Sequence, residues 1–258
     1  MDKRLQAFER LLGIVDEVRT KCPWDSIQTI ESIRHLTIEE TYELSEAILA
    51  NDLKEVKKEL GDLMLHIALY SKMGEEKGAF DIADVLDGIS EKMIVRHPHI
   101  FGDEKVEDAG QVSQNWEKIK LEKEHNRSVL GGVPESLPAL LKAYRMQQKA
   151  AGVGFEWTCA DDAWRKVEEE KCEMMAELDG NRQALAEEEF GDLLFALINY
   201  GRMRGLNAED AVDKANRKFR RRFASMEQQA RDKGLEFHNL TAEELKSFWK
   251  NAKMAENL

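Results

Sequence analysis

The chain has 258 residues, of which 42% are hydrophobic and 34% are charged, and its formal net charge is −12. This composition excludes a disordered chain. The strong negative charge also excludes binding of nucleic acid polymers through a broadly basic surface. No window of the sequence reaches the roughly 18 consecutive apolar residues of a membrane span, so no membrane partner is expected.

Strong helix formers dominate the segments between turns, Pro occurs only 4 times, and no alternating β-branched run is present. The sequence therefore predicts an all-α fold. The three cysteines are an odd number without a CxxC pair, and the N-terminus has no cleavable apolar segment. Both features favour a cytoplasmic protein with reduced thiols.

Two stretches of the chain resemble each other. KELGDLMLHIALY begins at Lys58, and EEFGDLLFALINY begins at Glu188, 130 residues later (188 − 58). Further downstream the offset falls to 126, where Asp210 corresponds to Asp84 (210 − 84). A repeat of this length indicates tandem domains rather than a solenoid.

The expected helices follow one another in the same order in each copy. They cover 29–50, 53–77, 81–97 and 111–124, then 160–178, 183–203, 208–232 and 241–255. Thr241 and Glu244 have the spacing of a capping box for the last helix. We expect two tandem repeated helical bundles, 1–125 and 139–258, joined by a linker over 126–138 that contains Gly-Gly, Pro and Ser.

Acidic residues interrupt the apolar stripe of the first repeated helix. Glu40 falls within this stripe and Glu43 on its border, one turn apart, so that their carboxylates are neighbours. On the next helix, Glu59 and Asp62 flank the face expected to be buried. That face consists of Val56, Leu60, Leu63, Ile67 and Tyr70. The second copy repeats the four acids at Glu170, Glu173, Glu189 and Asp192.

Two pairs of partly buried carboxylates on packed helices repel each other, and burying an unpaired carboxylate costs several kcal/mol. A positive charge must therefore lie among them. Four oxygen donors without paired His or Cys indicate a hard cation, Mg²⁺ or Mn²⁺. The alternative, that such acids are solvated edge residues pairing with lysines, is weakened by the repetition at identical spacing.

Cations on the third helix of the second copy extend this pattern. Arg222 falls within an apolar stripe, and Lys218 lies one turn earlier, so that the pair is suited to a phosphate chain. Trp249 and Lys253, one turn apart near the C-terminus, offer an aromatic plane and a further phosphate contact. A tryptophan at such a position is otherwise a core anchor.

The acidic pattern, EExxE followed by ExxD on the next helix, resembles the MazG family of nucleoside triphosphate pyrophosphohydrolases. It reads EETYE (39–43) with ELGD (59–62), and EEKCE (169–173) with EFGD (189–192). CPWD (22–25), RHPHIF (96–101), GGVPESLPAL (131–140) and VGFEW (153–157) are similar to the two-domain bacterial members. The likeness covers nearly the whole chain.

The resemblance implies an all-α NTP pyrophosphohydrolase fold, a homodimer and dependence on Mg²⁺, with Mn²⁺ as a substitute. It implies hydrolysis of an NTP or dNTP, by water attack at the α-phosphorus, to a nucleoside monophosphate and pyrophosphate. In this two-domain form, the C-terminal copy is the one credited with activity.

Carried over residue by residue, the resemblance implies the following site. The metal ligands are Glu170, Glu173, Glu189 and Asp192, with Glu40, Glu43, Glu59 and Asp62 as their N-terminal counterparts. For the chemical step, the candidate catalytic residues are Glu169, Glu170 and Glu189. We expect Glu169 to accept the proton, because it is a glutamate not committed to the metal. The nucleotide contacts are Lys166, Val167, Glu168, Glu169, Glu170, Lys218, Arg222, Trp249 and Lys253.

Two other classes of protein compete with this interpretation. One is a non-catalytic helical scaffold or partner-binding protein whose carboxylates hold structural metal ions. The other is a di-iron carboxylate bundle, which needs a Glu-x-x-His motif on each of two helices. The sequence EKEH (122–125) fits that motif once and has no counterpart, so the hydrolase is favoured.

Overall fold

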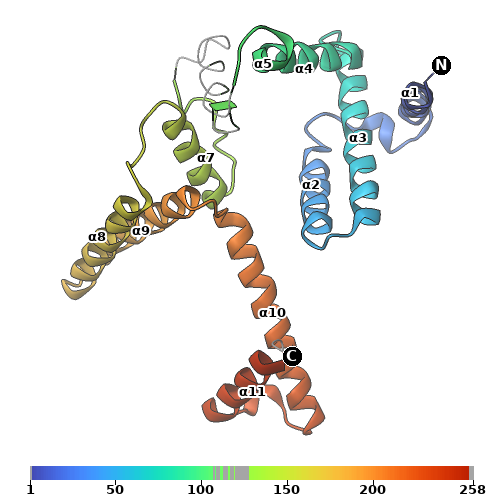
Figure 1. Cartoon of the computed structure of the whole chain (residues 1–258). Helices are drawn as coiled ribbons and strands as arrows, with labels where there is room; N and C mark the ends of the chain where they lie inside the picture. Colours follow the sequence, from blue (N-terminus) through green and yellow to red (C-terminus); the bar gives the residue numbers. More distant parts are fainter. Residues whose placement is uncertain are drawn as a thin grey trace. The chain divides into compact units, whose positions relative to one another are not determined.

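A computed structural model describes residues 2–106, 108, 111–112, 116, 119 and 128–255. The chain divides into two compact units, Met1–Lys105 and Val106–Leu258 (Figure 1). Each unit is built from helices, and the described residues contain no β-strand. The all-α fold class predicted from composition is therefore confirmed.

The N-terminal unit is organised around the antiparallel helices α2 and α3, with α1 packed on α3. Its elements are α1 (Lys3–Lys21), the short turn η1 (Asp25–Ile27), α2 (Arg34–Leu49), α3 (Leu53–Glu76), α4 (Ile82–Arg96) and α5 (Pro98–Phe101). Val15, Ile33 and Met73 are each 2% exposed and meet in one hydrophobic core. This core packs against the second half of α3, and the acidic residues Glu59 and Asp62 lie on the first half.

The C-terminal unit repeats the helical hairpin and adds a second core. Its elements are α7 (Ala139–Gly152), α8 (Ala160–Asp179), α9 (Gln183–Met203), α10 (Ala208–Asp232), the turn η2 (Phe237–Asn239) and α11 (Ala242–Ala255). α8 packs on α9, while α7 packs on α9 through Gln147, whose side-chain amide donates to the Phe195 carbonyl oxygen at 2.8 Å. Met226, Ala230, Phe248 and Ala252 join α10 to α11.

Most expected helices coincide with the observed ones: 53–77, 183–203 and 208–232 match α3, α9 and α10 to within one residue. The first expected helix, 29–50, begins later, at Arg34. Thr29 and Ser32 explain the delay, because each side-chain oxygen accepts a hydrogen bond from the other's backbone N–H, at 3.1 and 2.8 Å. Such local bonds compete with the helical ladder.

The remaining helices show what the pattern missed. Helices α1 and α7 had not been predicted. The capping box of α11 is present: Glu244 accepts from the Thr241 backbone N–H at 2.8 Å, and Thr241 Oγ1 accepts from the Glu244 N–H at 3.3 Å. The expected helix 111–124 and the EKEH motif lie largely outside the described residues. Residues 128–138, in the expected linker, form turns and bends.

The predicted buried face of α3 was partly wrong. Leu60 and Ile67 are 52% and 42% exposed, whereas Glu59, expected at the edge, is only 3% exposed. Helix α3 carries apolar residues on more than one side, and α1 and α2 cover only the side that includes Glu59. Periodicity identifies apolar positions but not the neighbour that covers them.

None of the helices in the described part of the chain is both long and apolar enough to cross a lipid bilayer. The three cysteines, Cys22, Cys159 and Cys172, form no disulfide bond.

The two acid-bearing hairpins share one turn conformation. Asn51, between α2 and α3, and Asn181, between α8 and α9, have φ angles of 55° and 56°. They are the two non-glycine residues of the described chain with a positive φ. Asn tolerates this left-handed region better than other residues with a Cβ, so both copies start their second helix from the same sharp turn.

Replacing Asn181 tests this turn. We expect Asn181→Ala to destabilise the protein by about 1 kcal/mol, because alanine pays the full steric cost of the left-handed conformation. We expect Asn181→Gly, the matched control, to leave stability nearly unchanged. The measurement is the midpoint of urea-induced unfolding followed by circular dichroism, and equal midpoints for the two variants would contradict the role of the turn.

Candidate functional site

The α8–α9 hairpin brings three carboxylates together. Glu170 lies on the face of α8 that packs against α9, one turn from the buried residue Val167, and is itself only 6% exposed. One carboxylate oxygen from each of Glu170, Glu173 and Glu189 lies within 4.8 Å of the others. The hairpin thus assembles three of the four acids that the sequence had marked.

The fourth acid, Asp192, is exposed and lies outside this group of three carboxylates. Its negative charge nevertheless affects the pKa of Glu189 within the group. Loss of hydration raises the pKa of Glu189 most, and the charges of Glu173, Glu170 and Asp192 raise that pKa further. Loss of hydration and proximity to Glu170 likewise raise the pKa of Glu173. These carboxyl groups therefore hold protons more tightly than solvated glutamates do.

One cation of the same helix already lies in the cluster. Lys166 Nζ is 2.6 Å from a carboxylate oxygen of Glu169 and 2.6 Å from one of Glu170. Its hydrogen bonds to these two residues raise the pKa of Lys166. A single ammonium group therefore partly offsets the negative charge of this cluster.

The other residues marked on α8 differ in accessibility. Val167 is 5% exposed and belongs to the core between α8 and α9. Glu168 and Glu169 are exposed. Glu169 lies outside the group of three converging carboxylates and forms an ion pair with Lys166.

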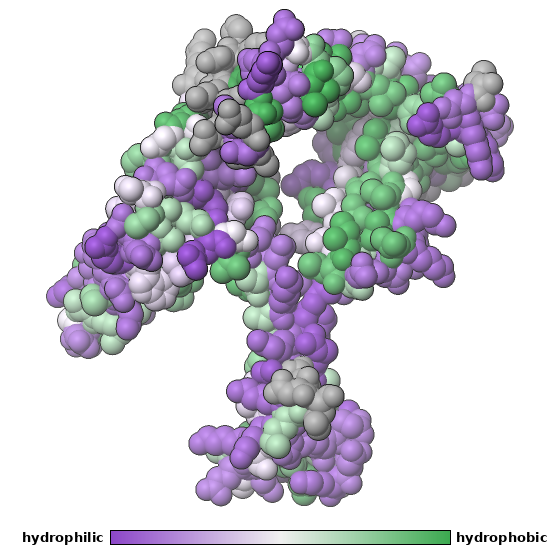
Figure 2. Space-filling model, in the orientation of Figure 1, coloured by the Kyte–Doolittle hydropathy of each residue, from purple (hydrophilic) through white to green (hydrophobic). Residues whose placement is uncertain are grey.

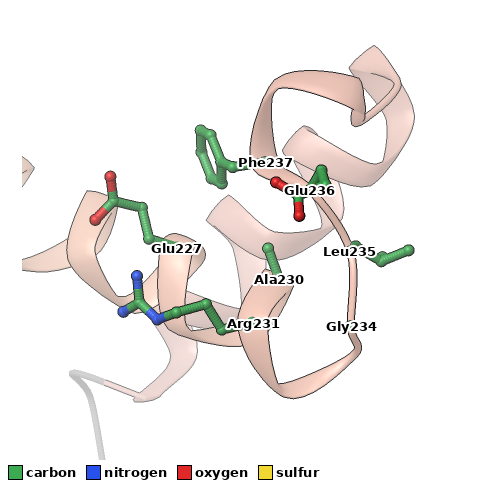
Figure 3. Close-up of a pocket in the computed structure, with 7 residues that line it drawn as sticks. All are labelled: Glu227, Ala230, Arg231, Gly234, Leu235, Glu236 and Phe237. Atoms are coloured by element: carbon green, nitrogen blue, oxygen red, sulfur yellow. The ribbon is translucent and has the colours of Figure 1, made fainter.

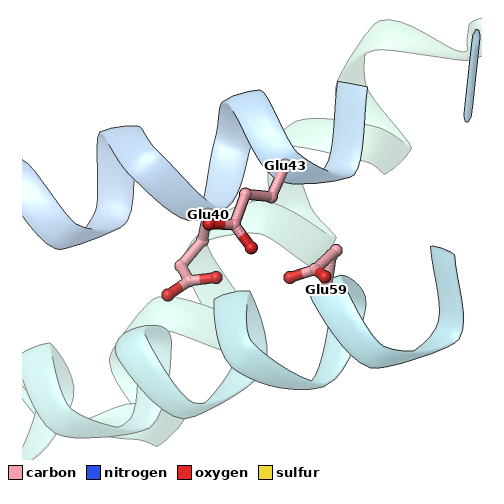
Figure 4. A group of neighbouring side chains, drawn as sticks. All are labelled: Glu40, Glu43 and Glu59. Atoms are coloured by element: carbon pink, nitrogen blue, oxygen red, sulfur yellow. The ribbon is translucent and has the colours of Figure 1, made fainter. Parts of the chain in front are cut away.

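The N-terminal copy holds an equivalent group on α2 and α3. Figure 4 shows the carboxylates of Glu40 and Glu43 directed from α2 towards that of Glu59 on α3, and oxygens of the three lie within 4.8 Å of one another. Burial raises the pKa of Glu40 most, followed by the charge of Asp62 and then the charges of Glu43 and Glu59. Asp62, like Asp192, acts from outside the group.

The cations marked near the C-terminus lie on α10 and α11. The Arg222 guanidinium carbon is 5.7 Å from the centre of the Trp249 ring. The centre of the Phe219 ring is 5.5 Å from the centre of the same Trp249 ring. Lys218 and Lys253 are exposed, each one turn from a member of this pair. Within the described single chain, α8 packs against α9 and not against α10, so the basic group and the acids occupy different parts of the fold.

Both acidic groups suit a hard divalent cation. Each offers three carboxylates from two helices, the donor type that Mg²⁺ and Mn²⁺ prefer. In the N-terminal group, Glu59 Oε2 is buried without a hydrogen-bond partner among the described residues. A buried carboxylate oxygen in this state is stabilised by a cation.

Comparison with known proteins agrees with this geometry. The family model described as the MazG nucleotide pyrophosphohydrolase domain matches residues 28–101 and 162–225, one segment in each copy. The chain belongs to the MazG family. Both matched segments contain an acid-bearing hairpin, which establishes the tandem repeat.

Individual MazG relatives match over nearly the whole chain. A protein of Escherichia coli K12 named nucleoside triphosphate pyrophosphohydrolase is 40% identical over 263 aligned residues, covering 98% of this chain and 99% of its own. A Thermotoga maritima protein named nucleoside triphosphate pyrophosphohydrolase/pyrophosphatase MazG is 39% identical, with 95% of each chain covered. Bacillus subtilis YabN is 43% identical over 96% of this chain and 52% of its own length.

The sequence reasoning missed how the two MazG copies differ in their lysines. In the N-terminal copy Lys58, next to Glu59 on α3, contacts Glu59 at 2.9 Å. In the C-terminal copy the contacting lysine, Lys166, lies on the first helix, where the 130-residue offset places Leu36 in copy one. Comparing the charges at aligned positions, rather than the shared motifs, would have revealed that the lysine lies on a different helix in each copy.

A separate cleft of about 380 Å³ lies at the end of α10 and is drawn in Figure 3. Its lining residues are Glu227, Ala230, Arg231, Gly234, Leu235, Glu236 and Phe237. None of them belongs to the predicted site, and the Phe237 ring packs 5.2 Å from that of Phe223.

The raised pKa values of Glu173 and Glu189 predict how metal binding depends on pH. Protons and the metal compete for these carboxylates, and protonation stabilises the metal-free fold as the pH falls through their raised pKa values. We therefore expect the increase in melting temperature caused by Mg²⁺ to shrink as the pH is lowered from about 8 to about 5. Thermal unfolding with Mg²⁺ or with a chelator measures this, and a pH-independent increase would contradict it.

Proposed function

We propose that this MazG protein is a Mg²⁺-dependent nucleoside triphosphate pyrophosphohydrolase, which converts an NTP or dNTP to the monophosphate and pyrophosphate. The observation that carries the proposal is the group formed by Glu170, Glu173 and Glu189 across the α8–α9 hairpin. Its oxygen donors fit a hard cation, and the near full-length relatives in E. coli and T. maritima carry this activity in their names.

The side chains around this group have separate tasks in the proposal. Glu170, Glu173, Glu189 and Asp192 hold Mg²⁺, with Mn²⁺ as a substitute. When bound, the ion offsets the charge of the triphosphate and makes water more acidic. The carboxylate of Glu169 accepts the proton of the attacking water. Lys166, which lies one turn before Glu169 on α8, donates hydrogen bonds to the phosphate chain.

The basic group of α10 and α11 completes the nucleotide site. Lys218 and Arg222 stabilise the charge that develops on the leaving pyrophosphate. Trp249, already in contact with Arg222, and Lys253 supply the aromatic plane and the last phosphate contact. Because α10 does not pack on α8 in the described single chain, we propose that the assembled oligomer with bound nucleotide brings the two groups together.

Turnover tests the acidic group directly. We expect Glu189→Gln to lower the rate of pyrophosphate release with Mg²⁺ by about a hundredfold or more, because it removes a metal-binding charge. Glu187→Gln, an exposed acid on the same helix, is the matched control and should keep full activity. If Glu189→Gln turned over triphosphates at the unmodified rate, the C-terminal group would not be the active site.

We further propose that the protein is a homodimer. In α9 the residues Phe190, Leu194 and Leu197 form a stripe that is 50%, 38% and 39% exposed. The 130-residue offset places the same kind of stripe on α3, at Leu60, Met64 and Ile67. Figure 2 shows hydrophobic surface over α2 and α3. Apolar stripes left open at equivalent positions suit self-association about a two-fold axis.

A charge in the stripe tests this assembly. We expect Leu194→Asp to shift the molecular mass in solution from dimer to monomer, because a carboxylate buried at an apolar interface is left unpaired. Glu188→Lys, on the opposite edge of α9, is the control and should remain dimeric. Sedimentation velocity measures the mass, and a dimeric Leu194→Asp protein would remove the α9 stripe from the interface.

A further inference from the structure

One edge of α9 continues beyond the acidic group of the C-terminal hairpin. Asp192, Phe195, Asn199 and Arg202 recur at intervals of three and four residues and therefore lie along the same side of the helix. Phe195 lies six residues beyond Glu189, which is about 9 Å along the helix axis. Its aromatic side chain is 42% exposed. The edge thus leads from the carboxylates to an open aromatic ring.

Helix α7 places a buried amide beside Phe195. Gln147 is 7% exposed, and its Nε2 donates to the carbonyl oxygen of Phe195 at 2.8 Å. This bond fixes the orientation of the amide and leaves Oε1 as its unused group. Gln147 Oε1 is buried and accepts no hydrogen bond in the described part of the chain. A buried acceptor in this state favours a ligand that brings an N–H or O–H donor.

A second amide lies one turn further along the same edge. Asn199 is half-buried, and its Oδ1 accepts from Arg202 at 2.9 Å. Arg202 is in turn paired with Glu156, from the loop between α7 and α8. These contacts direct the Asn199 oxygen towards Arg202, so that the amide nitrogen is the donor available to a ligand. The edge therefore offers one acceptor, from Gln147, and one donor, from Asn199.

The N-terminal copy closes the same edge with apolar side chains. The 130-residue offset places Leu65 opposite Phe195 and Leu69 opposite Asn199. Both leucines pack in the core that α1 forms with α3, and Leu69 is 7% exposed. The helical hairpin therefore folds without an aromatic ring and an amide at these two positions, and packing alone does not explain them in the C-terminal copy.

Only one direction along the hairpin offers this surface to a nucleotide bound at the acids. In the other direction the hairpin closes, and Arg182 and Glu177 form an ion pair there. The edge is also separate from the apolar stripe proposed for the dimer. Phe195 follows Leu194, a member of that stripe, by one residue, which is about 100° around the helix. The stripe can therefore be buried in a dimer while Phe195 stays open.

We propose that the nucleobase of the triphosphate stacks on Phe195 and that the amides of Gln147 and Asn199 recognise its edge. This inference rests on the proposed function and concerns the part of the substrate that the acids do not touch. Gln147 Oε1 accepts from an N–H group of the base, and the Asn199 amide nitrogen donates to a neighbouring acceptor. The site therefore selects a base with an N–H donor beside an acceptor, as the exocyclic amino group and adjacent ring nitrogen of adenine provide.

Steady-state kinetics of ATP hydrolysis with Mg²⁺ test the stacking. Phe195→Leu introduces the residue found in the N-terminal copy. We expect it to raise KM for ATP about tenfold and to affect kcat less, because base–aromatic stacking is lost while the acidic group is intact. Phe101→Leu, at a phenylalanine that is 61% exposed in the N-terminal unit, is the matched control and should leave KM unchanged. An unchanged KM for Phe195→Leu would overturn the proposal.

A comparison of two substrates tests recognition of the edge. A purine ribonucleoside triphosphate without the 6-amino group lacks the donor for Gln147, so the unmodified protein should have a kcat/KM about tenfold lower for it than for ATP. Gln147→Met, which keeps the side-chain length but removes the amide, should bring this ratio close to one. Since both substrates meet the same protein, a general loss of folding or activity does not change the ratio.

The outcomes separate this proposal from the proposed hydrolase. Equal kcat/KM for the two purines in the unmodified protein, or an unchanged ratio in Gln147→Met, would contradict the recognition of the base by Gln147. Failure of triphosphate turnover in the unmodified protein would instead overturn the proposed function.

Discussion

Mutual repulsion among carboxylates on two packed helices is the interaction on which this protein depends. Small side chains allow the helices to approach: Ala163, Ala186 and Ala196, along the α8–α9 hairpin, are 1%, 4% and 9% exposed. The close approach brings Glu170, Glu173 and Glu189 to within 4.8 Å of one another. Such a group is stable only with positive charge beside it, and Lys166 supplies part of that charge in the free protein. A divalent ion can supply the remainder.

Duplication has kept the hairpin and changed its surroundings. Both copies turn at an asparagine with a positive φ, and both converge three glutamates. The neutralising lysine, however, lies on the second helix in one copy and on the first helix in the other. The position of this lysine therefore distinguishes two hairpins whose acidic groups are otherwise equivalent.

The unpartnered apolar stripes connect the fold to assembly. Phe190 and Leu194 on α9, and Leu60 and Met64 on α3, are exposed at equivalent positions of the two copies, and the proposed homodimer would bury them. The same stripe accounts for the error in the predicted face of α3, because this helix is apolar on two sides and only one of them is covered within the chain. The acidic groups depend on the packing of two helices, which holds their carboxylates close together.

The sequence by itself determined the all-α class, the repeat, the bounds of α3, α9 and α10, and the acids of each hairpin, because these follow from local helix propensity and from 3.6-residue spacing. Only the tertiary structure decided that Glu59 is buried while Leu60 is exposed, that Asp62 and Asp192 lie outside the converging groups, and which lysine neutralises each group. Those properties depend on the neighbour that covers each helix face. That neighbour is set by contacts between residues far apart in the chain, which local spacing does not encode.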